Sequence, residues 1–445
     1  MRKSWLLALV ALFCLSIWSL LLAGCSSSGG MAVLQPMPQP TQPAQPTPAP
    51  TPQPADPMPQ PTPTPTPTPQ PAPDPAPQPQ PTPQPTPDPA PQPTPDPTPQ
   101  PAPTTTVVPH FAIVVSQDNT IATYAIDPAT GELHITSSVG SGGSTPVSVA
   151  VDPTGHFAYV ANFMGGGVSA FSIDADTGTL TPVGSPAVGG DGVRFVAVHP
   201  NGKFVYIVNA ASNNVSTYSI DPGTGALSAV GSPVPTQHTP LSIALDPKGT
   251  YAYVANSDVN TISMFAIVPA TGALAILGNP VTVGENPTFV TVHASGKFAY
   301  VANTVSQTVS VLAIDPGSGT LATAGDPVPT SGTFPIAIAG DPSGKFLYVA
   351  NVNTGDICAF AVNSTTGALS PIGTRVPTGD APVSLNVDPS GKYLLAANSQ
   401  SDNVSVFAID PKTGEITSAG PPTPTGKTPS SVVTIGKLIN ATPSN

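Results

Sequence analysis

The chain has 445 residues, of which 63 are prolines, 8% are charged and 6% are aromatic, and it carries a formal net charge of −12. This composition disfavours a coiled coil. The net negative charge also argues against nucleic acid as a partner, because phosphate groups require basic surfaces. Of the prolines, 33 lie within residues 36–103. So many rigid residues without a backbone N–H prevent a hydrogen-bonded core there, so the folded region must follow them.

Residues 1–24 have the features of a bacterial signal peptide, with two basic residues before an apolar segment that ends at Leu22. The sequence Leu-Ala-Gly-Cys at 22–25 resembles the lipobox of bacterial lipoproteins, whose Cys thiol carries diacylglycerol. The resemblance implies that Cys25 becomes the lipidated first residue of the mature chain, with acyl chains that bind it to a membrane. An uncleaved membrane anchor is the alternative, since the apolar segment is nearly long enough to span a bilayer.

Ser26 and the residues after it predict where the protein resides. Ser at the position after the lipidated cysteine resembles the outer-membrane address of Gram-negative lipoproteins. We therefore expect a cell-envelope protein, anchored at Cys25 in the outer membrane or facing the periplasm. Residues 25–35 would form the lipidated N-terminus, and residues 36–106 a Pro-rich disordered stalk of polyproline II character.

Internal repeats decide the fold of residues 107–440. The string Asp-Pro-Thr-Gly-His-Phe-Ala-Tyr-Val-Ala-Asn, which begins at Asp152, returns five times in variant form at spacings of 47 or 48 residues. A period in the forties is typical of propeller blades or helical arrays. Frequent Val, Ile, Tyr, Phe and Thr, broken by Gly and Pro, favour short strands. In the first complete unit the expected strands are 147–151, 157–161, 168–173 and 180–183.

The two ends of the repeat region predict how a ring closes. Residues 111–115 match a second strand with no first strand before it, and residues 428–435 match a first strand with no blade after it. We therefore predict an all-β fold, a seven-bladed β-propeller of four-stranded antiparallel blades. The C-terminal strand would pair with the N-terminal blade, which leaves only short outer edges and favours a monomer, with 441–445 as a tail.

The ends of the second strands carry a recognisable motif, Tyr-Val-Ala-Asn, at 159–162, 253–256, 300–303 and 348–351. This motif resembles the YVTN-type repeat, and the whole of 107–440 is similar to the lactonase-type seven-bladed propellers, a family that includes 6-phosphogluconolactonases. Tracing a blade puts the loops that lead into first strands on the same face as the second-to-third-strand loops. We name this the top face and expect any ligand there, above the central channel, because its loops vary.

The family resemblance also implies a catalytic neighbourhood. An Arg-His pair at the start of one inner strand, with a Glu just past the next strand, marks that neighbourhood in lactonases. Here Arg194 matches, but Phe195 stands in place of the His and Ala210 in place of the Glu. Arg194 would stabilise an oxyanion or anchor a carboxylate, while the general base is missing from its expected place.

Further candidates come from the top-face loops. His238 is the histidine best placed for catalysis, and Arg194, Phe195, Asp191 and Glu285 are expected to surround a ligand. The chain has no HExxH motif, paired cysteines or EF-hand loop, so no metal or other cofactor is expected.

Three residues that attract attention are expected to be structural. His199 and His293 replace the turn Asp of their sister repeats, where a ring nitrogen can accept the same hydrogen bond. Cys358 stands where sister repeats carry Ser, which predicts a packed thiol.

Two functions remain open at the level of sequence. The departures at Phe195 and Ala210 favour a binding propeller, which holds an unidentified small molecule or a protein partner on its top face. The alternative is a lactone hydrolase of the 6-phosphogluconolactonase type, so whether the protein is an enzyme stays undecided.

Overall fold

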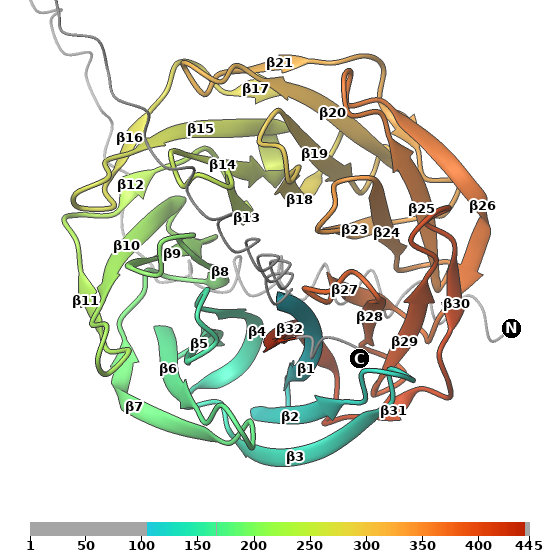
Figure 1. Cartoon of the computed structure of the whole chain (residues 1–445). Helices are drawn as coiled ribbons and strands as arrows, with labels where there is room; N and C mark the ends of the chain where they lie inside the picture. The colour runs from blue at the N-terminus through green and yellow to red at the C-terminus, as the bar shows by residue number, and fades with distance from the viewer. Residues whose placement is uncertain (1–104, 166, 441–445) are drawn as a thin grey trace, which may run out of the picture. The chain divides into compact units, whose positions relative to one another are not determined.

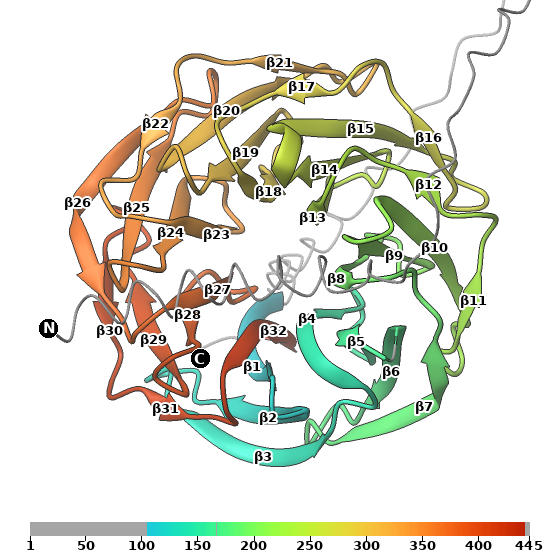
Figure 2. The ribbon, with the colours of Figure 1, turned by 180° about the vertical axis from the view of Figure 1, so that it is seen from behind.

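The computed structural model describes residues 105–165 and 167–440, which form seven antiparallel sheets arranged as blades of a propeller (Figure 1). The seven innermost strands lie nearest the centre in both face-on views (Figures 1 and 2). In order from blade 1 they are β32 (Pro429–Asn440), β4 (Ser144–Val151), β8 (Val193–Val198), β13 (Pro240–Leu245), β18 (Pro287–Val292), β23 (Pro335–Gly340) and β27 (Pro382–Val387).

The second and third strands build the buried middle of each blade. The second strands are β1 (Thr105–Ser116), β5 (Phe157–Met164), β9 (Phe204–Asn209), β14 (Tyr251–Asn256), β19 (Phe298–Asn303), β24 (Phe346–Asn351) and β28 (Tyr393–Asn398). The third strands are β2 (Thr120–Ile126), β6 (Gly167–Ile173), β10 (Asn214–Ile220), β15 (Thr261–Ile267), β20 (Thr308–Ile314), β25 (Asp356–Val362) and β29 (Asn403–Ile409).

The outer strands are continuous in three blades and split in four. The continuous ones are β3 (Leu133–Gly140), β7 (Leu180–Ala187) and β26 (Leu369–Pro377). The split ones are β11 (Leu227–Ala229) with β12 (Val234–Pro235), β16 (Leu274–Ile276) with β17 (Val281–Thr282), β21 (Leu321–Thr323) with β22 (Val328–Pro329), and β30 (Ile416–Ser418) with β31 (Thr423–Pro424). A single 3-10 turn, η1 (Ser257–Val259), interrupts the strands of the described region.

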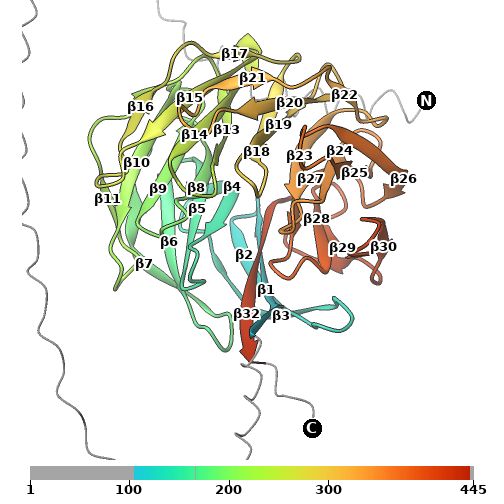
Figure 3. The ribbon, with the colours of Figure 1, turned by 45° about the horizontal axis from the view of Figure 1, so that its top comes forward.

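The predicted ring closure is confirmed. Strand β32 pairs antiparallel with β1 in the order β3-β2-β1-β32, so the last strand of the described region completes the first blade (Figure 3). The pairing runs from Pro429 beside Ser116 to Asn440 beside Thr105. The sequence therefore predicted the blade count, the strand order and the closure correctly. The structure lengthens some strands and splits the outer strand of four blades.

Aromatic side chains join each blade to the next through the turn between third and fourth strands. Tyr253 is fully buried and donates its hydroxyl to the carbonyl oxygen of Gly319 in the next blade, at 2.9 Å. Gly319 has a φ of 72°, and a Cβ there would lie 2.2 Å from Cδ1 of Tyr251, so glycine is required. The same hydroxyl-to-glycine bond recurs from Tyr159, Tyr206, Tyr300 and Tyr348.

Several sequence-based expectations lie outside the described residues. The signal peptide, Cys25, the Pro-rich stalk and the tail at 441–445 are among them. Within 105–165 and 167–440, no helix has the length and apolar character needed to cross a membrane.

Candidate functional site

The loops that lead into the inner strands, which we name connecting loops, are fixed to the second-to-third-strand loops. The backbone N–H of Thr239 donates to Oδ1 of Asn213, and that of Asn286 to Oδ1 of Asn260, both at 2.8 Å. The two loop types therefore share one face, as the sequence predicted, and this top face is cross-linked by hydrogen bonds.

The backbone passes through the left-handed region once at or just before the start of each inner strand. Six of the seven residues in this conformation are not glycine, and such residues cost roughly 1 kcal/mol or more each, so the surrounding bonds must hold them. They are Thr145, Gly192, Thr239, Asn286, Phe334, Ala381 and Thr428, with φ between 52° and 67°. The top face thus repeats one rigid backbone shape seven times and varies its side chains.

One side chain per blade precedes that left-handed residue, and we name these seven the rim residues. They are Ser144, Asp191, His238, Glu285, Thr333, Asp380 and Lys427, and all except Thr333 are exposed. The backbone N–H groups of Asp191 and Glu285 donate to the hydroxyls of Ser212 and Ser306 at 2.7 Å, which fixes their backbones. Asp191, His238 and Glu285, singled out from sequence, therefore hold equivalent positions on the consecutive blades 3, 4 and 5.

The rim is acidic. It carries three carboxylates against the single cation of Lys427, whose Nζ lies 2.7 Å from Oδ2 of Asp402. The hydrogen bond and charge of Lys427 hold the pKa of Asp402 below its usual range, and Asp402 raises the pKa of Lys427 in turn. The rim therefore offers little attraction to a dianionic phosphate group.

Arg194 lies at a bulge that recurs in every inner strand. The pairing of β8 with β9 shifts between Val193 and Phe195, so Arg194 is the bulged residue. Bulges re-aim side chains and are frequent beside active sites. The equivalent bulge residues are Val147, Leu241, Thr288, Ile336, Val383 and Ser430. All seven are half-buried, and Arg194 is the charged member of the set.

Blade 5 shows which residue faces the bulge. Thr288 and Thr304 hold in blade 5 the positions of Arg194 and Ala210 in blade 3, and their hydroxyl oxygens lie 2.9 Å apart. A longer side chain at position 210 would thus be directed at Arg194. The methyl group of Ala210 supplies no acid or base there, as the sequence indicated.

Phe195 packs where the family pattern has His. Its ring meets Phe289 of blade 5 edge to face, with centroids 5.8 Å apart, and both side chains are half-buried. Phe195 also packs against the apolar cluster of blades 3 and 4. The residue therefore supplies an apolar wall beside Arg194.

The two turn histidines are structural, as predicted. His199 is buried, its Nδ1 accepts the backbone N–H of Asn201 at 3.1 Å, and its Nε2 donates to the carbonyl oxygen of Gly249 at 2.8 Å. His293 makes the equivalent bonds to Ser295 and Gly344. The Nδ1 contact repeats the one that Asp246 makes to the N–H of Lys248, so the histidines keep the turn and add a bond to the following blade.

No three His, Cys, Asp or Glu side chains gather as metal ligands would within the part of the chain that the structure describes.

A family model described as lactonase, 7-bladed beta-propeller, matches residues 109–185, 168–241, 186–335 and 293–434. Together these matches span the propeller from 109 to 434. The chain belongs to this lactonase family. A search of curated proteins finds no match to the sequence.

Solved structures resemble this lactonase-family propeller over nearly their whole length. A candidate 6-phosphogluconolactonase from Bacteroides uniformis is 23% identical, with a TM-score of 0.66, and the match covers 74% of this chain and 99% of that one. One from Bacteroides fragilis is 24% identical, with a TM-score of 0.64 and coverage of 76% and 100%. The periplasmic gluconolactonase of Pseudomonas aeruginosa is 21% identical, with a TM-score of 0.64 and coverage of 73% and 99%. At these identities the likeness establishes the fold.

Proposed function

We propose that the protein hydrolyses a sugar lactone on the top face of blades 3 to 5. The observation that carries the proposal is the position of Arg194, the charged member of the bulge set, on the same blade as Asp191, with His238 and Glu285 on the next two blades. Membership of the lactonase family, and likeness to proteins described as gluconolactonases, support this over a purely binding role.

The chemistry assigns a role to each group. The Arg194 guanidinium donates to the lactone carbonyl oxygen and stabilises the oxyanion when water attacks the carbonyl carbon. His238 or a rim carboxylate accepts the proton of that water, because Phe195 and Ala210 supply no base. The ring C–O bond then breaks, the alkoxide takes up a proton, and a hydroxy acid leaves.

The charge of the rim narrows the substrate class. Asp191, Glu285 and Asp380 oppose an added phosphate, and the charge of Lys427 is paired with Asp402. We therefore infer an uncharged sugar lactone rather than a phosphorylated one.

A turnover assay on the purified chain tests the proposal. Glucono-δ-lactone should be hydrolysed faster than its spontaneous rate, and faster than its 6-phospho derivative. Arg194→Gln should lower kcat/KM about tenfold to a hundredfold, since one oxyanion donor is lost. Lys297→Ala, on the opposite face, is the matched control and should leave the rate unchanged. Equal loss in both variants, or no turnover by the parent, would contradict the proposal.

Restoring the family's His and Glu beside Arg194 is a gain-of-function test of the same site. Ala210→Glu with Phe195→His would restore the family pattern beside Arg194, as the Thr288 and Thr304 contact indicates. Turnover should rise in the double variant, with a pH profile that reports the new groups. An unchanged rate, in a variant that keeps the parent's melting temperature, would show that Arg194 is not the reacting centre.

A binding propeller is the second candidate, favoured by the apolar wall of Phe195 and Phe289 in place of a catalytic histidine. In that case sugar lactones or their hydrolysed acids should bind on calorimetric titration, with no turnover, and Arg194→Gln should weaken the binding.

We further propose that the propeller is held in the cell envelope by lipid on Cys25. A radioactive fatty acid should label the parent and not Cys25→Ala. Equal label in both would refute lipidation at this residue.

A further inference from the structure

The seven blades have the same fold, so a position at which one blade alone departs from its sisters carries information beyond folding. Blade 6 departs at several positions that lie together. One is Arg375 on β26, which precedes Val376, the partner of Ile357. The residues at its position in the other blades are Pro186, Pro233, Pro280, Pro327 and Pro422, with Ser138 in blade 1.

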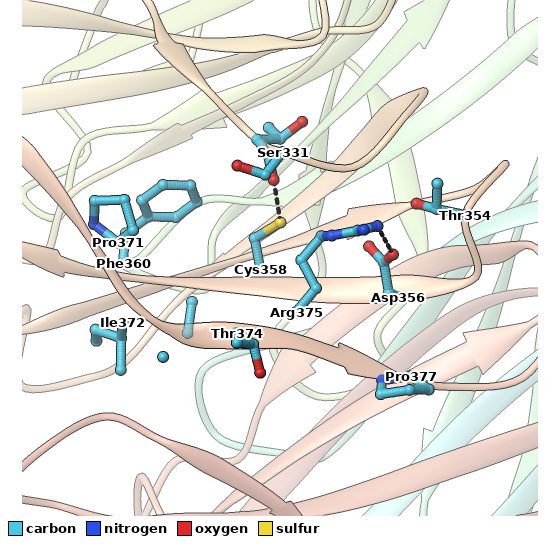
Figure 4. Close-up of a pocket in the computed structure, with 13 residues that line it drawn as sticks. Ser331, Thr354, Asp356, Cys358, Phe360, Pro371, Ile372, Thr374, Arg375 and Pro377 are labelled. Carbon is cyan, nitrogen blue, oxygen red and sulfur yellow. Dashed lines mark hydrogen bonds and ion pairs between the residues drawn. The ribbon is translucent and has the colours of Figure 1, made fainter.

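The partner of Arg375 is exceptional too. Asp356 begins β25, at a position occupied elsewhere by uncharged residues: Thr120, Gly167, Asn214, Thr261, Thr308 and Asn403. Arg375 Nη1 donates to Oδ2 of Asp356, in an ion pair drawn in Figure 4. Both members of this pair are therefore charged only in blade 6.

The loop that leads into blade 6 carries an inserted residue beside this pair. Val281 and Val328 hold equivalent positions 47 residues apart, whereas Pro287 and Pro335 are 48 apart. The glycines at 284 and 332 pack on Asn303 and Asn351 in the same way, so the added residue is Ser331, which has a φ of 58°.

These exceptional residues line one groove of about 660 Å³ in blade 6 (Figure 4). Hydroxyl groups come from Ser331, Thr354 and Thr374, and an apolar wall comes from Phe360, Pro371 and Ile372. Groove, insertion and charged pair therefore coincide in one blade of seven.

Asp356 holds Arg375 in place. Its side chain is only 8% exposed, and its second carboxylate oxygen accepts the Nδ2–H of Asn351 at 2.9 Å. Arg375 is 41% exposed, and in the described part of the chain its one hydrogen bond is to Asp356. A guanidinium has five N–H groups, so four are left for a ligand in the groove, in a fork that matches a carboxylate.

Cys358, also in the groove, contributes no chemistry. Burial raises the pKa of its thiol to about 11, and the thiol donates to the carbonyl oxygen of Thr330. The protonated thiol replaces the Ser of sister blades as part of the wall.

We propose that the blade-6 groove binds a small hydroxylated carboxylate, with Arg375 as the anchor of the carboxylate and Asp356 as its positioning residue. The hydroxyls of Ser331, Thr354 and Thr374 match the hydroxyl groups of such a ligand, and Phe360, Pro371 and Ile372 match its carbon chain. This groove lies outside the catalytic set on blades 3 to 5, so the inference stands whether or not those blades hydrolyse lactones.

Calorimetric titration of the full chain with sodium gluconate tests the proposal. Arg375→Gln should weaken binding about tenfold or more. Asp356→Asn with Cys358→Ser and Arg375→Pro gives blade 6 residue types that its sisters carry, so this variant should fold and should lose gluconate binding in the blade-6 groove. Arg194→Gln should keep the blade-6 affinity, because it alters only the proposed hydrolytic site. Glucose, which has no carboxylate, should not compete.

The proposal would be overturned by no gluconate binding by the parent, unchanged affinity in Arg375→Gln, equal competition by glucose, or loss of binding in Arg194→Gln alone. If the triple variant melts at a lower temperature but binds as the parent does, the Asp356 and Arg375 pair is structural and the ligand site is absent.

Discussion

The two faces of the propeller use the same sevenfold scaffold in opposite ways. On the bottom face the turns repeat their side chains, with an Asp or a His that closes each first turn and a glycine under an aromatic ring at each second turn. On the top face the backbone repeats, and the rim residues differ from blade to blade. The contrast teaches that the bottom face specifies the fold, while the top face is free to vary for function.

The largest expected effect comes from a bottom-face glycine. Gly319→Ala should destabilise the protein by roughly 3 kcal/mol, because it adds a Cβ beside Tyr251 to a left-handed residue. The matched control is Gly231→Ala, at φ 61° with no atom within 4 Å of the added Cβ, which should cost only about 1 kcal/mol. Urea denaturation measures both. Equal losses of unfolding free energy in the two variants would mean that the contact between Gly319 and the Tyr251 ring does not contribute to the cost.

A smaller effect is expected from the hydroxyl that joins two blades. Tyr253→Phe leaves the buried carbonyl of Gly319 without its donor and should cost about 1–2 kcal/mol. Tyr251→Phe removes a bond of the same length to Gly317, but at an exposed carbonyl that water can reach, so its cost should be less. The urea midpoints of the two variants test this order of stability. A larger loss of stability in Tyr251→Phe than in Tyr253→Phe would contradict the prediction.

Acid should destabilise the protein through the Asp turns of the bottom face. The hydroxyl and backbone N–H of Ser318 hold the pKa of Asp315 below its usual range, and four other turns lower the pKa of Asp127, Asp174, Asp221 and Asp410 in the same way. A lowered folded-state pKa contributes stability that is complete above the unfolded value, about 3.9, and is lost as pH falls through the folded value. The melting temperature should therefore be level from pH 7 to 5 and should fall below about pH 4.

Blade 6 supplies the control for this acid effect. Asn363 occupies the equivalent turn and accepts the N–H groups of Thr365 and Thr366 at 2.9 and 3.0 Å without titrating. Asp315→Asn should therefore keep most of the stability at pH 7 and reduce the drop in melting temperature on acidification. An unchanged acid drop would assign the effect to other carboxylates.

The smallest effect on stability is expected at the rim. Glu285→Gln should change the free energy of unfolding by less than about 0.5 kcal/mol, because the side chain is exposed and its backbone N–H keeps the bond to Ser306. A loss as large as that of Tyr253→Phe would show that the rim, too, serves the fold.

The fold was predictable because the same pattern of strands and turns recurs in all seven blades. Turn glycines fixed the blade count, and the unmatched strands at the two ends predicted the pairing of β32 with β1. The sequence also placed Asp191, His238 and Glu285 on the correct face. Their equivalence on successive blades depends on the left-handed residue after each, which composition does not reveal.

The groove of blade 6 was missed, although its signal was present in the sequence. Arg375 interrupts a column of prolines, and Asp356 interrupts a column of uncharged residues. To align these equivalent positions across the blades, one must know how each outer strand pairs with its third strand. In blade 6 this pairing shifts at Cys358, opposite the bulge of β26. Comparing repeats with one another, position by position, is thus a route to sites that a family motif does not mark.

The closure of blade 1 also determines when that blade can form during biosynthesis. Thr105 pairs with Asn440, so the first strand made must wait for the last one before its blade is complete. During synthesis, Thr105 meets Asn440 only after 335 further residues have followed it, a contact order that favours slow folding. A chain that ends early, even within the final dozen residues, would lack the partner of β1 and would present that edge to other chains. An intact last strand is therefore what protects the edge of the first one.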